Sequence, residues 1–243
     1  MTDAVFARVP GGKGANQAVA AARLGARVRF IGRIGTDDTV LRSLEREGVD
    51  TSGVTRDDGE SGMALVVVEA SGENLIVVAP GANRRLRPAD VEVGDADAVI
   101  CQQEIPNAAV AAAAAGAPFF CLNAAPARGR LELEPDLLVV NRYEYEVVGP
   151  YRGLVALTLG REGAVLLDGG EEIVRASPPR VEAVDGTAAG DAFCAALVVS
   201  LLEGRDRSQA LTRACAAGAL AASRPGAQPS LPTAAEIDVA VAG

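Results

Sequence analysis

The spacing of apolar and polar positions along the chain predicts an α/β fold. Residues 16 to 24 (NQAVAAARL) are alanine-rich and end at Gly25, which is typical of a helix with a glycine C-cap. Residues 27 to 32 (RVRFIG) have the composition of a strand, and a second helix is predicted from 38 to 47, where Gly48 stops it. Helix and strand therefore alternate in the first part of the chain.

Further apolar runs of strand length follow. They are DAVIC (97 to 101), PFFCL (118 to 122), DLLVV (136 to 140) and LVALTL (154 to 159). Because helical segments separate several of them, these runs predict a mostly parallel central sheet flanked by helices. Residues 142 to 153 give about the minimum length for a crossover between parallel strands, so no full helix is expected there.

One β-rich region interrupts this order. Residues 63 to 79 (MALVVVEASGENLIVVA) contain two apolar runs around SGEN at 71 to 74, the composition of a β-hairpin. We expect this hairpin to lie outside the central sheet as a small lid. The predicted organisation is an α/β domain of residues 1 to 50 and 81 to 243, with residues 51 to 80 forming the lid.

Composition and charge narrow the chemistry. The 243 residues include no histidine, which excludes Ser-His-Asp and Cys-His catalytic groups and leaves carboxylates, one lysine and backbone dipoles. The net charge of −9 argues against a nucleic-acid partner, because a phosphate backbone requires a basic surface. No apolar run reaches the roughly 18 residues of a membrane span, and the first residues lack a secretory signal pattern. We therefore expect a cytoplasmic protein with no membrane partner.

The four cysteines do not form a metal or redox motif. Cys101, Cys121, Cys194 and Cys215 stand singly in apolar segments, without C-x-x-C spacing. We expect them to be buried, reduced core residues.

A glycine-rich segment near the start of the chain carries one candidate group. Residues 10 to 26 (PGGKGANQAVAAARLGA) contain Lys13, the single lysine among 23 basic residues. A lysine in a glycine-rich turn is ordinarily solvated, so an exposed turn residue is the alternative to a functional role.

A second segment, VDGTAAGDAFCAAL at 184 to 197, runs from a turn of small residues into an apolar helix. The backbone N–H groups of Ala188, Ala189 and Gly190 at the helix start can bind an anion. Asp191 beside them can orient and deprotonate a substrate hydroxyl. The alternative is that Asp191 only caps its helix.

These two segments carry a family resemblance. GGKGANQA (11 to 18) and DGTAAGDAF (185 to 193) resemble, in order and separation, the two signature motifs of the ribokinase-like sugar kinases, the phosphofructokinase B type. Other segments also resemble parts of the family: GENLIVVAPGAN (72 to 83), LNAAPAR (122 to 128), N-x-x-E at Asn141 and Glu144, TLGREGA (158 to 164) and GAQPS (226 to 230). The resemblance covers almost the whole chain. It implies the ribokinase-like α/β fold and in-line transfer of the ATP γ-phosphoryl group to a sugar hydroxyl.

The resemblance also implies roles for matching residues. Asp191 would be the general base for the sugar's primary hydroxyl, and Ala188, Ala189 and Gly190 would form the anion hole. The sugar site would comprise Gly12, Lys13, Gly14, Asn16, Glu104 and Asp191. Lysine supplies a compact charge where a guanidinium fork would be too wide for a cleft floored by glycine.

The nucleotide and ion sites follow in the same way. Asn141, Thr158, Gly160 and Gly163 would border ATP, and Glu144 would organise magnesium through water. A potassium site beside the anion hole would comprise Asp185, Thr187, the backbone around Ala221 and Arg224, Gly226 and Ser230, since oxygen ligands suit a hard cation. The expected cofactors are ATP, magnesium and potassium. Because related lids pair, we also expect a homodimer through the lid.

The chain departs from the family pattern in two places. Family members carry a strand and lid segment upstream of the Gly-Gly pair, and a helix between N-x-x-E and the T-L-G strand; neither is matched here. A central sheet without that strand would expose strand edges. Three interpretations stay open: a kinase acting on the 5-hydroxyl of ribose, favoured by LNAAPAR and GAQPS; another sugar or nucleoside kinase of the family; and a shortened homologue that binds without catalysis. A dinucleotide-dependent oxidoreductase is disfavoured, because no G-x-G-x-x-G follows a predicted strand.

Overall fold

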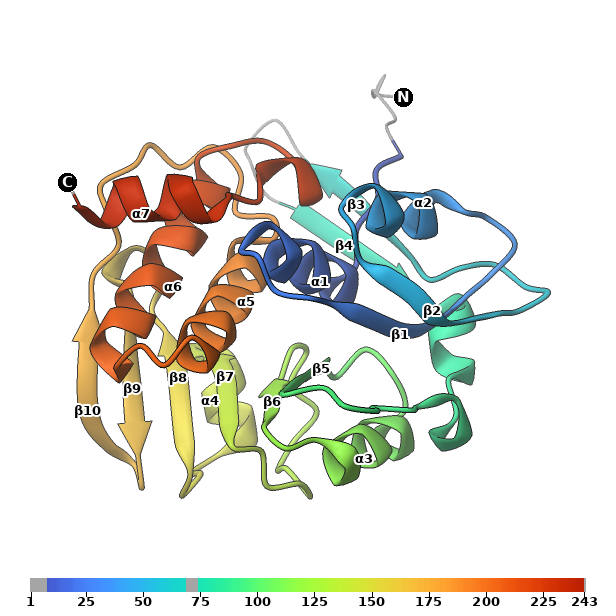
Figure 1. The fold of residues 1–243 in the computed structure, drawn as a ribbon, viewed down its shortest axis with the longest axis horizontal. Coiled ribbons are helices and arrows are strands. Elements are labelled where there is room, and N and C mark those ends of the chain that lie inside the picture. Colours follow the sequence, from blue (N-terminus) through green and yellow to red (C-terminus); the bar gives the residue numbers. More distant parts are fainter. Residues whose placement is uncertain (1–7, 69–73, 243) are drawn as a thin grey trace.

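The computed structural model describes residues 8–68 and 74–242, and it has the predicted α/β architecture (Figure 1). The α-helices are α1 (Lys13–Arg23), α2 (Thr39–Arg46), α3 (Asn107–Gly116), α4 (Arg142–Val148), α5 (Ala189–Leu202), α6 (Arg207–Ala222) and α7 (Ala234–Ala242). The strands are β1 (Arg29–Ile34), β2 (Asp50–Arg56), β3 (Met63–Val68), β4 (Asn74–Ala79), β5 (Val99–Gln102), β6 (Phe120–Asn123), β7 (Leu137–Asn141), β8 (Leu154–Thr158), β9 (Ala164–Asp168) and β10 (Glu171–Ala176).

A six-stranded sheet forms the centre, with the strand order β10-β9-β8-β7-β6-β5. Strands β5 to β8 are parallel, whereas β9 and β10 are added antiparallel. Since successive side chains point to opposite faces, β7 sends Leu137 and Val139 into one apolar cluster and Leu138 and Val140 into another. These four residues are at most 2% exposed. Burial on both faces explains the continuous apolar run DLLVV.

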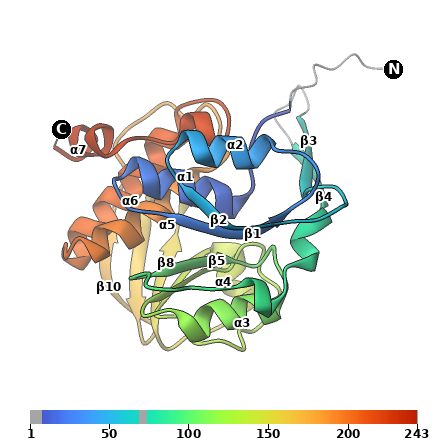
Figure 2. The ribbon, with the colours of Figure 1, turned by 45° about the vertical axis from the view of Figure 1, so that its right-hand side comes forward.

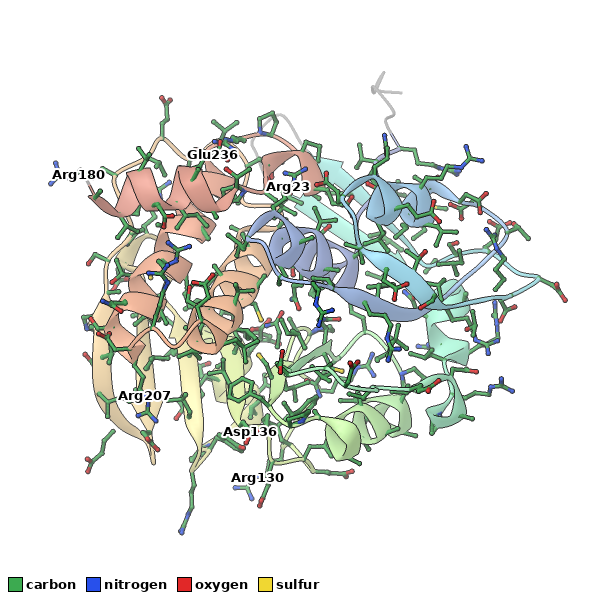
Figure 3. All side chains as sticks on the ribbon, viewed as in Figure 1. Arg23, Arg130, Asp136, Arg180, Arg207 and Glu236 are labelled. Atoms are coloured by element: carbon green, nitrogen blue, oxygen red, sulfur yellow. The ribbon has the colours of Figure 1, made fainter. Side chains whose placement is uncertain are left out.

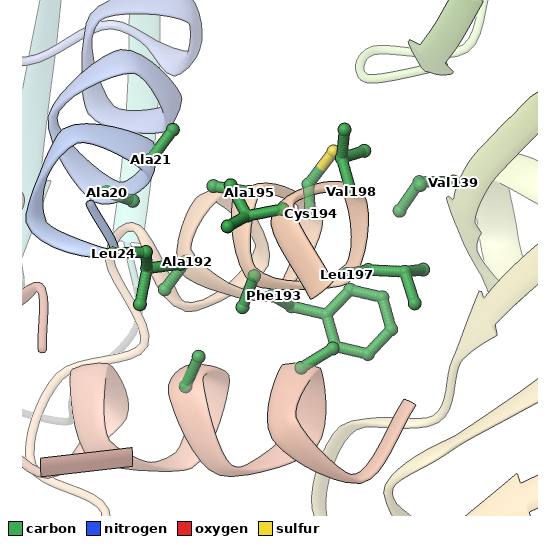
Figure 4. Close-up of a cluster of buried hydrophobic side chains, with 14 of the residues drawn as sticks. Ala20, Ala21, Leu24, Val139, Ala192, Phe193, Cys194, Ala195, Leu197 and Val198 are labelled. Atoms are coloured by element: carbon green, nitrogen blue, oxygen red, sulfur yellow. The ribbon is translucent and has the colours of Figure 1, made fainter. Parts of the chain in front are cut away.

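Helices cover both faces of this sheet. On one face, the apolar helix α5 lies between α1 and the sheet, and Figure 4 shows its Val198 between Ala21 of α1 and Val139 of β7. The many alanines of α1, α5 and α6 allow close approach of the helices. On the other face, Val110 of α3 and Val148 of α4 pack against the second cluster. The fold therefore has helices on both faces of a mostly parallel sheet, as predicted.

Strands β1 and β2 form a separate parallel pair beside β5 (Figure 2). Within residues 8–68 and 74–242, no further strand pairs with β1 or with the outer edge of β5. A cavity of about 1570 Å³ extends between these strands, and its walls include Phe30 of β1 and Ile100 of β5. The sequence-based expectation of exposed strand edges agrees with this arrangement.

Helix α4 corrects the expectation for residues 142 to 153. The sequence predicts no full helix there, yet α4 forms two turns between β7 and β8. Asn141 caps it, because its side-chain oxygen accepts the N–H of Glu144 at 2.8 Å and its own N–H donates to the Glu144 carboxylate at 2.8 Å. This capping box starts the helix, and Gly149 with φ of 78° ends it.

The predicted hairpin is present as a two-stranded antiparallel sheet of its own. Its register runs from Met63 opposite Ala79 to Val68 opposite Asn74, while the predicted turn residues 71–73 lie outside the described residues. Leu65 and Val77 lie directly opposite one another and are 48% and 53% exposed. The hairpin therefore carries partly exposed apolar side chains, and it forms a sheet separate from the central one (Figure 1).

Polar side chains connect several of the elements, and Figure 3 labels two of these residues, Arg23 and Asp136. Arg23, in the last turn of α1, pairs with Glu47 at 2.6 Å and donates to the Leu231 carbonyl at 2.6 Å. At the sheet, Asp136 accepts the Phe120 N–H at 2.7 Å. The contacts of Arg23 join α1 to the segment after α2 and to the C-terminal region, and so help to fix the helix that carries the candidate site.

The predicted state of the cysteines is confirmed. All four thiols are free and buried, with the Cys121 and Cys194 sulfurs 3.9 Å apart between β6 and α5. Among the described helices, none has both the length and the apolar character to cross a membrane.

Candidate active site

The first turns of α1 and α5 meet at one carboxylate. Asn16 Nδ2 donates to Asp191 Oδ2 at 2.8 Å, and Gln17 Nε2 donates to Asp191 Oδ1 at 2.9 Å. The three residues are 5%, 2% and 7% exposed, in the order Asn16, Gln17, Asp191. Both Asp191 oxygens thus bond to α1, so the alternative that Asp191 only caps its own helix is wrong.

The residues before α1 and α5 both have a backbone conformation with positive φ. Gly12 precedes α1 with φ of 94°, a value that glycine adopts without strain. Ala188 precedes α5 with φ of 60°, and it is the one non-glycine residue with positive φ in the described chain. A left-handed alanine costs about 1 kcal/mol or more, and such strain gathers at functional sites.

The predicted anion hole is partly engaged in this conformation. Ala188 makes no side-chain capping bond to α5, as an alanine cannot. The Ala189 N–H donates to the Gly186 carbonyl at 3.2 Å, which closes the turn before the helix. The positive end of the α5 dipole lies at this turn, so the turn favours an anion.

Burial sets the protonation behaviour of Asp191. It raises the pKa of this carboxyl from its ordinary 3.8 to about 6. The hydrogen bonds from Asn16 and Gln17 and the charge of Lys13 act in the opposite direction, and the charge of Glu104 adds to the rise. Asp191 is therefore ionised above about pH 6 and can accept a proton near neutrality.

Lys13 forms an ion pair with a carboxylate at the cavity wall. Its Nζ lies 3.1 Å from Glu104 Oε1, with the two side chains 35% and 31% exposed. Lys13 is thus a paired, partly buried residue rather than a freely solvated one. The cavity wall contains every predicted sugar-site residue, namely Gly12, Lys13, Gly14, Asn16, Glu104 and Asp191.

Two further features of the cavity wall, at Gly14 and at Asn16, affect which ligand groups it can accept. A Cβ on Gly14 would lie 2.9 Å from Gln102 Oε1, so glycine leaves room for that amide. Asn16 Oδ1 is buried without a hydrogen-bond partner in the described part of the chain. Since buried polar atoms are nearly always paired, this acceptor beside Asp191 fits a ligand hydroxyl.

The predicted nucleotide residues lie at the carboxyl ends of β7 and β8. Asn141 is opposite Thr158 in the parallel register, and Gly160 and Gly163 flank the turn into β9. These residues lie outside the cavity wall described above. A Cβ on Gly163 would come within 2.0 Å of the Ala176 carbonyl, so packing against β10 already requires glycine there.

Glu144 belongs to the same region. Burial raises the pKa of its carboxyl, while the Asn141 N–H and the charge of Lys13 lower it. The Glu144 carboxylate contacts Asn141, which lies at the end of β7. In the described residues, no group of three or more carboxylate or thiol side chains is placed to hold a metal ion.

Asp185 connects two of the other predicted potassium residues, Thr187 and Gly226. Its Oδ1 accepts the Thr187 N–H at 2.9 Å and the Thr187 hydroxyl at 2.6 Å, and its Oδ2 accepts the Gly226 N–H at 2.8 Å. The Val184 and Asp185 N–H groups donate to the Ala222 carbonyl, next to Ala221. These oxygens have the hard character that an alkali cation requires.

Two side chains of that set, those of Ser230 and Arg224, have partners elsewhere. Ser230 is fully buried and its hydroxyl donates to the Ala227 carbonyl at 2.7 Å. The Arg224 guanidinium pairs with Glu236, so only its backbone is available toward the turn at Asp185.

Sequence reasoning missed three amides in the site. They are Gln17, Gln102 and Asn123: Gln17 forms hydrogen bonds with both of the others and with Asp191. The available signal was a second amide, Gln17, within the otherwise apolar helical run after Lys13.

Comparisons with known proteins agree with this geometry. The model of the pfkB family carbohydrate kinases matches residues 2–234. The ribokinase of Bacillus subtilis is 38% identical, over 96% of this chain and 88% of its own length. The ribokinase of Haemophilus influenzae is 36% identical, over 92% and 84%. The structure of Arabidopsis thaliana ribokinase complexed with ribose and ATP matches with a TM-score of 0.85 and 27% identity, covering 95% of this chain and 87% of that one.

Proposed function

The chain belongs to the pfkB family of carbohydrate kinases, which are phosphotransferases acting on an alcohol group, and we propose that it phosphorylates the 5-hydroxyl of D-ribose with ATP. The relatives at 36% and 38% identity are ribokinases, and the structural neighbour holds ribose and ATP. The observation that carries the proposal is the buried Asp191, held by Asn16 and Gln17 in a cavity that also contains Lys13 and Glu104.

Asp191 is the proposed general base. In its ionised form it accepts the proton of the sugar's primary hydroxyl as the hydroxyl oxygen forms a bond to the γ-phosphorus. The bond from the γ-phosphorus to the β,γ-bridging oxygen breaks, and ADP leaves with that electron pair. Ala188, Ala189 and Gly190, at the positive end of α5, stabilise the charge on the transferred group.

The sugar site is proposed from complementary polar groups. The unpaired Asn16 Oδ1 accepts one sugar hydroxyl, and Glu104 accepts another. Lys13 pairs with Glu104 through one ammonium hydrogen and donates another to a sugar oxygen. Gly12 and Gly14 leave room for the sugar beside the backbone.

The nucleotide is proposed to lie along the ends of β7 and β8. Asn141, Thr158, Gly160 and Gly163 would border it, supported by their common position at the end of the sheet. Glu144 lies in the first turn of α4, three residues after Asn141, and a single carboxylate acting through water suits magnesium, which keeps most of its hydration shell. The oxygen-rich turn of Asp185 and Thr187, with Gly226, supports potassium as the second ion.

The hairpin within residues 51 to 80 is proposed as the lid over the sugar. Met63, Leu65 and Val78 line the cavity, which supports closure over the bound sugar. The same hairpin leaves Leu65 and Val77 about half exposed, and pairing of two copies through it would cover that surface. We propose the cytoplasm as the location of the protein, because a kinase needs a compartment that supplies ATP.

A substrate panel tests the proposal. ADP release is measured with ribose, 2-deoxyribose, fructose and a nucleoside, with magnesium and potassium present. Ribose is expected to give the highest kcat/KM. If fructose or the nucleoside is phosphorylated and ribose is not, the ribose assignment is refuted, while the family assignment still stands. Binding of ribose in calorimetry without ADP release from any substrate would refute catalysis itself.

A further inference from the structure

A chain of amide hydrogen bonds runs from the central sheet to Asp191. Asn123 Nδ2 donates to the Val139 carbonyl of β7 at 3.2 Å. Gln17 Nε2 donates to Asn123 Oδ1 at 3.1 Å and to Asp191 Oδ1 at 2.9 Å. Gln102 Nε2 donates to Gln17 Oε1 at 2.6 Å. Both hydrogens of Gln17 Nε2 and the oxygen Oε1 therefore have hydrogen-bond partners within the protein.

The Val139 carbonyl fixes the orientation of the amides in this series of hydrogen bonds. A backbone carbonyl can only accept a hydrogen bond, so the amide nitrogen of Asn123 faces Val139 and its oxygen faces Gln17. Gln17 must then present its nitrogen to Asn123. The second hydrogen of the same nitrogen points at Asp191, so Gln17 can donate to this carboxylate and cannot accept from it.

We propose that Gln17 is a positioning residue that holds the Asp191 carboxylate in its ionised form and in one orientation, with the direction of its amide fixed by Val139 through Asn123. This inference rests on the proposed function, in which Asp191 must be ionised to accept a proton. The anchor is rigid, because Val139 lies on a strand that is buried on both faces. A donor held by the sheet stabilises the anion without reorganisation during the reaction.

The charged neighbours of Asp191 cannot replace this donor. Lys13 and Glu104 are the charged groups that act on it, and their effects on the pKa of Asp191 oppose each other. They also pair with each other at 3.1 Å. The neutral donors Asn16 and Gln17 are thus the direct partners of the buried carboxylate, and Asn16 also supplies the unpaired oxygen of the sugar site.

The test removes the donor and follows the pH dependence. Gln17→Met keeps similar length without a hydrogen bond, and it is expected to raise the pKa of Asp191 by about one unit or more. The fall in kcat toward low pH then begins about one unit higher, so the variant loses at least about fivefold more activity at pH 6 than at pH 8. The KM for ribose is expected to stay within about twofold, because the sugar-site groups remain.

Asn123→Leu is the second variant and releases the amide of Gln17 from its anchor. It is expected to shift the kcat profile in the same direction by a smaller amount. It also keeps the proposal testable if Gln17→Met does not fold.

Ser200→Ala is the matched control. Ser200 is 2% exposed on α5 and accepts a hydrogen bond from Arg213 at 3.2 Å. It lies nine residues beyond Asp191, about 13 Å along the helix. This variant is expected to lower stability and leave the midpoint of the kcat profile unchanged.

A second readout needs no activity. The carboxyl carbon-13 signal of Asp191, assigned by its loss in Asp191→Asn, is titrated in the wild type and in Gln17→Met. An upward shift of its midpoint supports the proposal even if ribose is not phosphorylated, in which case only the proposed function fails. If Gln17→Met lowers stability but leaves both the titration and the kcat midpoint unchanged, Gln17 is a packing residue and the proposal is wrong.

Discussion

Asn16 Nδ2 lies 2.8 Å from Asp191 Oδ2, although 175 residues separate them in the sequence. The contact joins the first turn of α1 to the first turn of α5. It makes the candidate general base and an amide of the candidate sugar site parts of one buried unit. A change at either residue is therefore expected to alter both sugar binding and proton transfer.

The raised pKa of Asp191 predicts the acid limb of the activity profile. Its pKa in the folded protein is about 6, so the carboxylate is ionised above this pH and protonated below it. Activity requires the ionised form, and kcat is expected to fall about tenfold between pH 8 and pH 5. The measurement is kcat at saturating ribose and ATP from pH 5 to 9, with the folded state followed by circular dichroism. A kcat that stays constant down to pH 5 in folded protein contradicts this role.

The role of Lys13 in ribose binding is predicted to need both the positive charge and the small size of the ammonium group. Lys13→Met and Lys13→Arg are both expected to raise the KM for ribose by about tenfold or more, because arginine keeps the charge but needs more space beside Gly12 and Gly14. Steady-state kinetics with varied ribose measure this effect. Arg180→Lys, an exchange at an exposed position, serves as the control and should leave KM unchanged. Full activity in Lys13→Arg would show that only the charge matters.

The left-handed backbone at Ala188 predicts responses of different size to two substitutions. Valine is β-branched and fits φ of 60° poorly, so Ala188→Val is expected to lower the free energy of unfolding by about 1–2 kcal/mol or more. Ala188→Gly is expected to change it by less than about 1 kcal/mol, since glycine adopts this conformation freely. Urea unfolding of the three proteins measures the difference. Equal stabilities for the valine and glycine variants would contradict the strained turn.

The exposed apolar side of the hairpin predicts a specific effect on assembly. Leu65→Glu places a charge opposite Val77, and it is expected to convert a dimer into monomers because burying an unpaired carboxylate is costly. Analytical ultracentrifugation of the wild type and the variant tests this. The control is Ile173→Glu, at an exposed apolar position on β10. A wild type that is monomeric at all concentrations, or a dimer that survives Leu65→Glu, argues against pairing through the hairpin.

Much of the fold could be predicted from local patterns. Gly25 and Gly48 stop helices with φ of 92° and 76°, as glycine at a helix end does. The buried strand β7 appears in the sequence as a continuous apolar run, and the hairpin appears as two runs around a polar turn. These features depend on short-range chemistry, so they are readable without a structure.

Other features depend on contacts between distant segments. The resemblance suggested a magnesium role for Glu144, and the structure adds a capping box with Asn141 that explains the unexpected helix α4. Gln17 gave no signal of its function beyond its position in a helix, because its partners Asn123 and Asp191 lie 106 and 174 residues away. The separation of β1 and β2 from the six-stranded sheet also follows from long-range pairing.

The most direct test of the account is the formation of ribose 5-phosphate from ribose and ATP by this chain, beside Asp191→Asn. The product is identified by phosphorus-31 NMR, and folding of both proteins is checked by circular dichroism. We predict ribose 5-phosphate from the wild type and a rate about 10²–10⁴ lower from Asp191→Asn. Formation of ribose 5-phosphate at an undiminished rate by Asp191→Asn, or no product from folded wild-type protein, would contradict the assignment of Asp191 as the base of a ribose kinase.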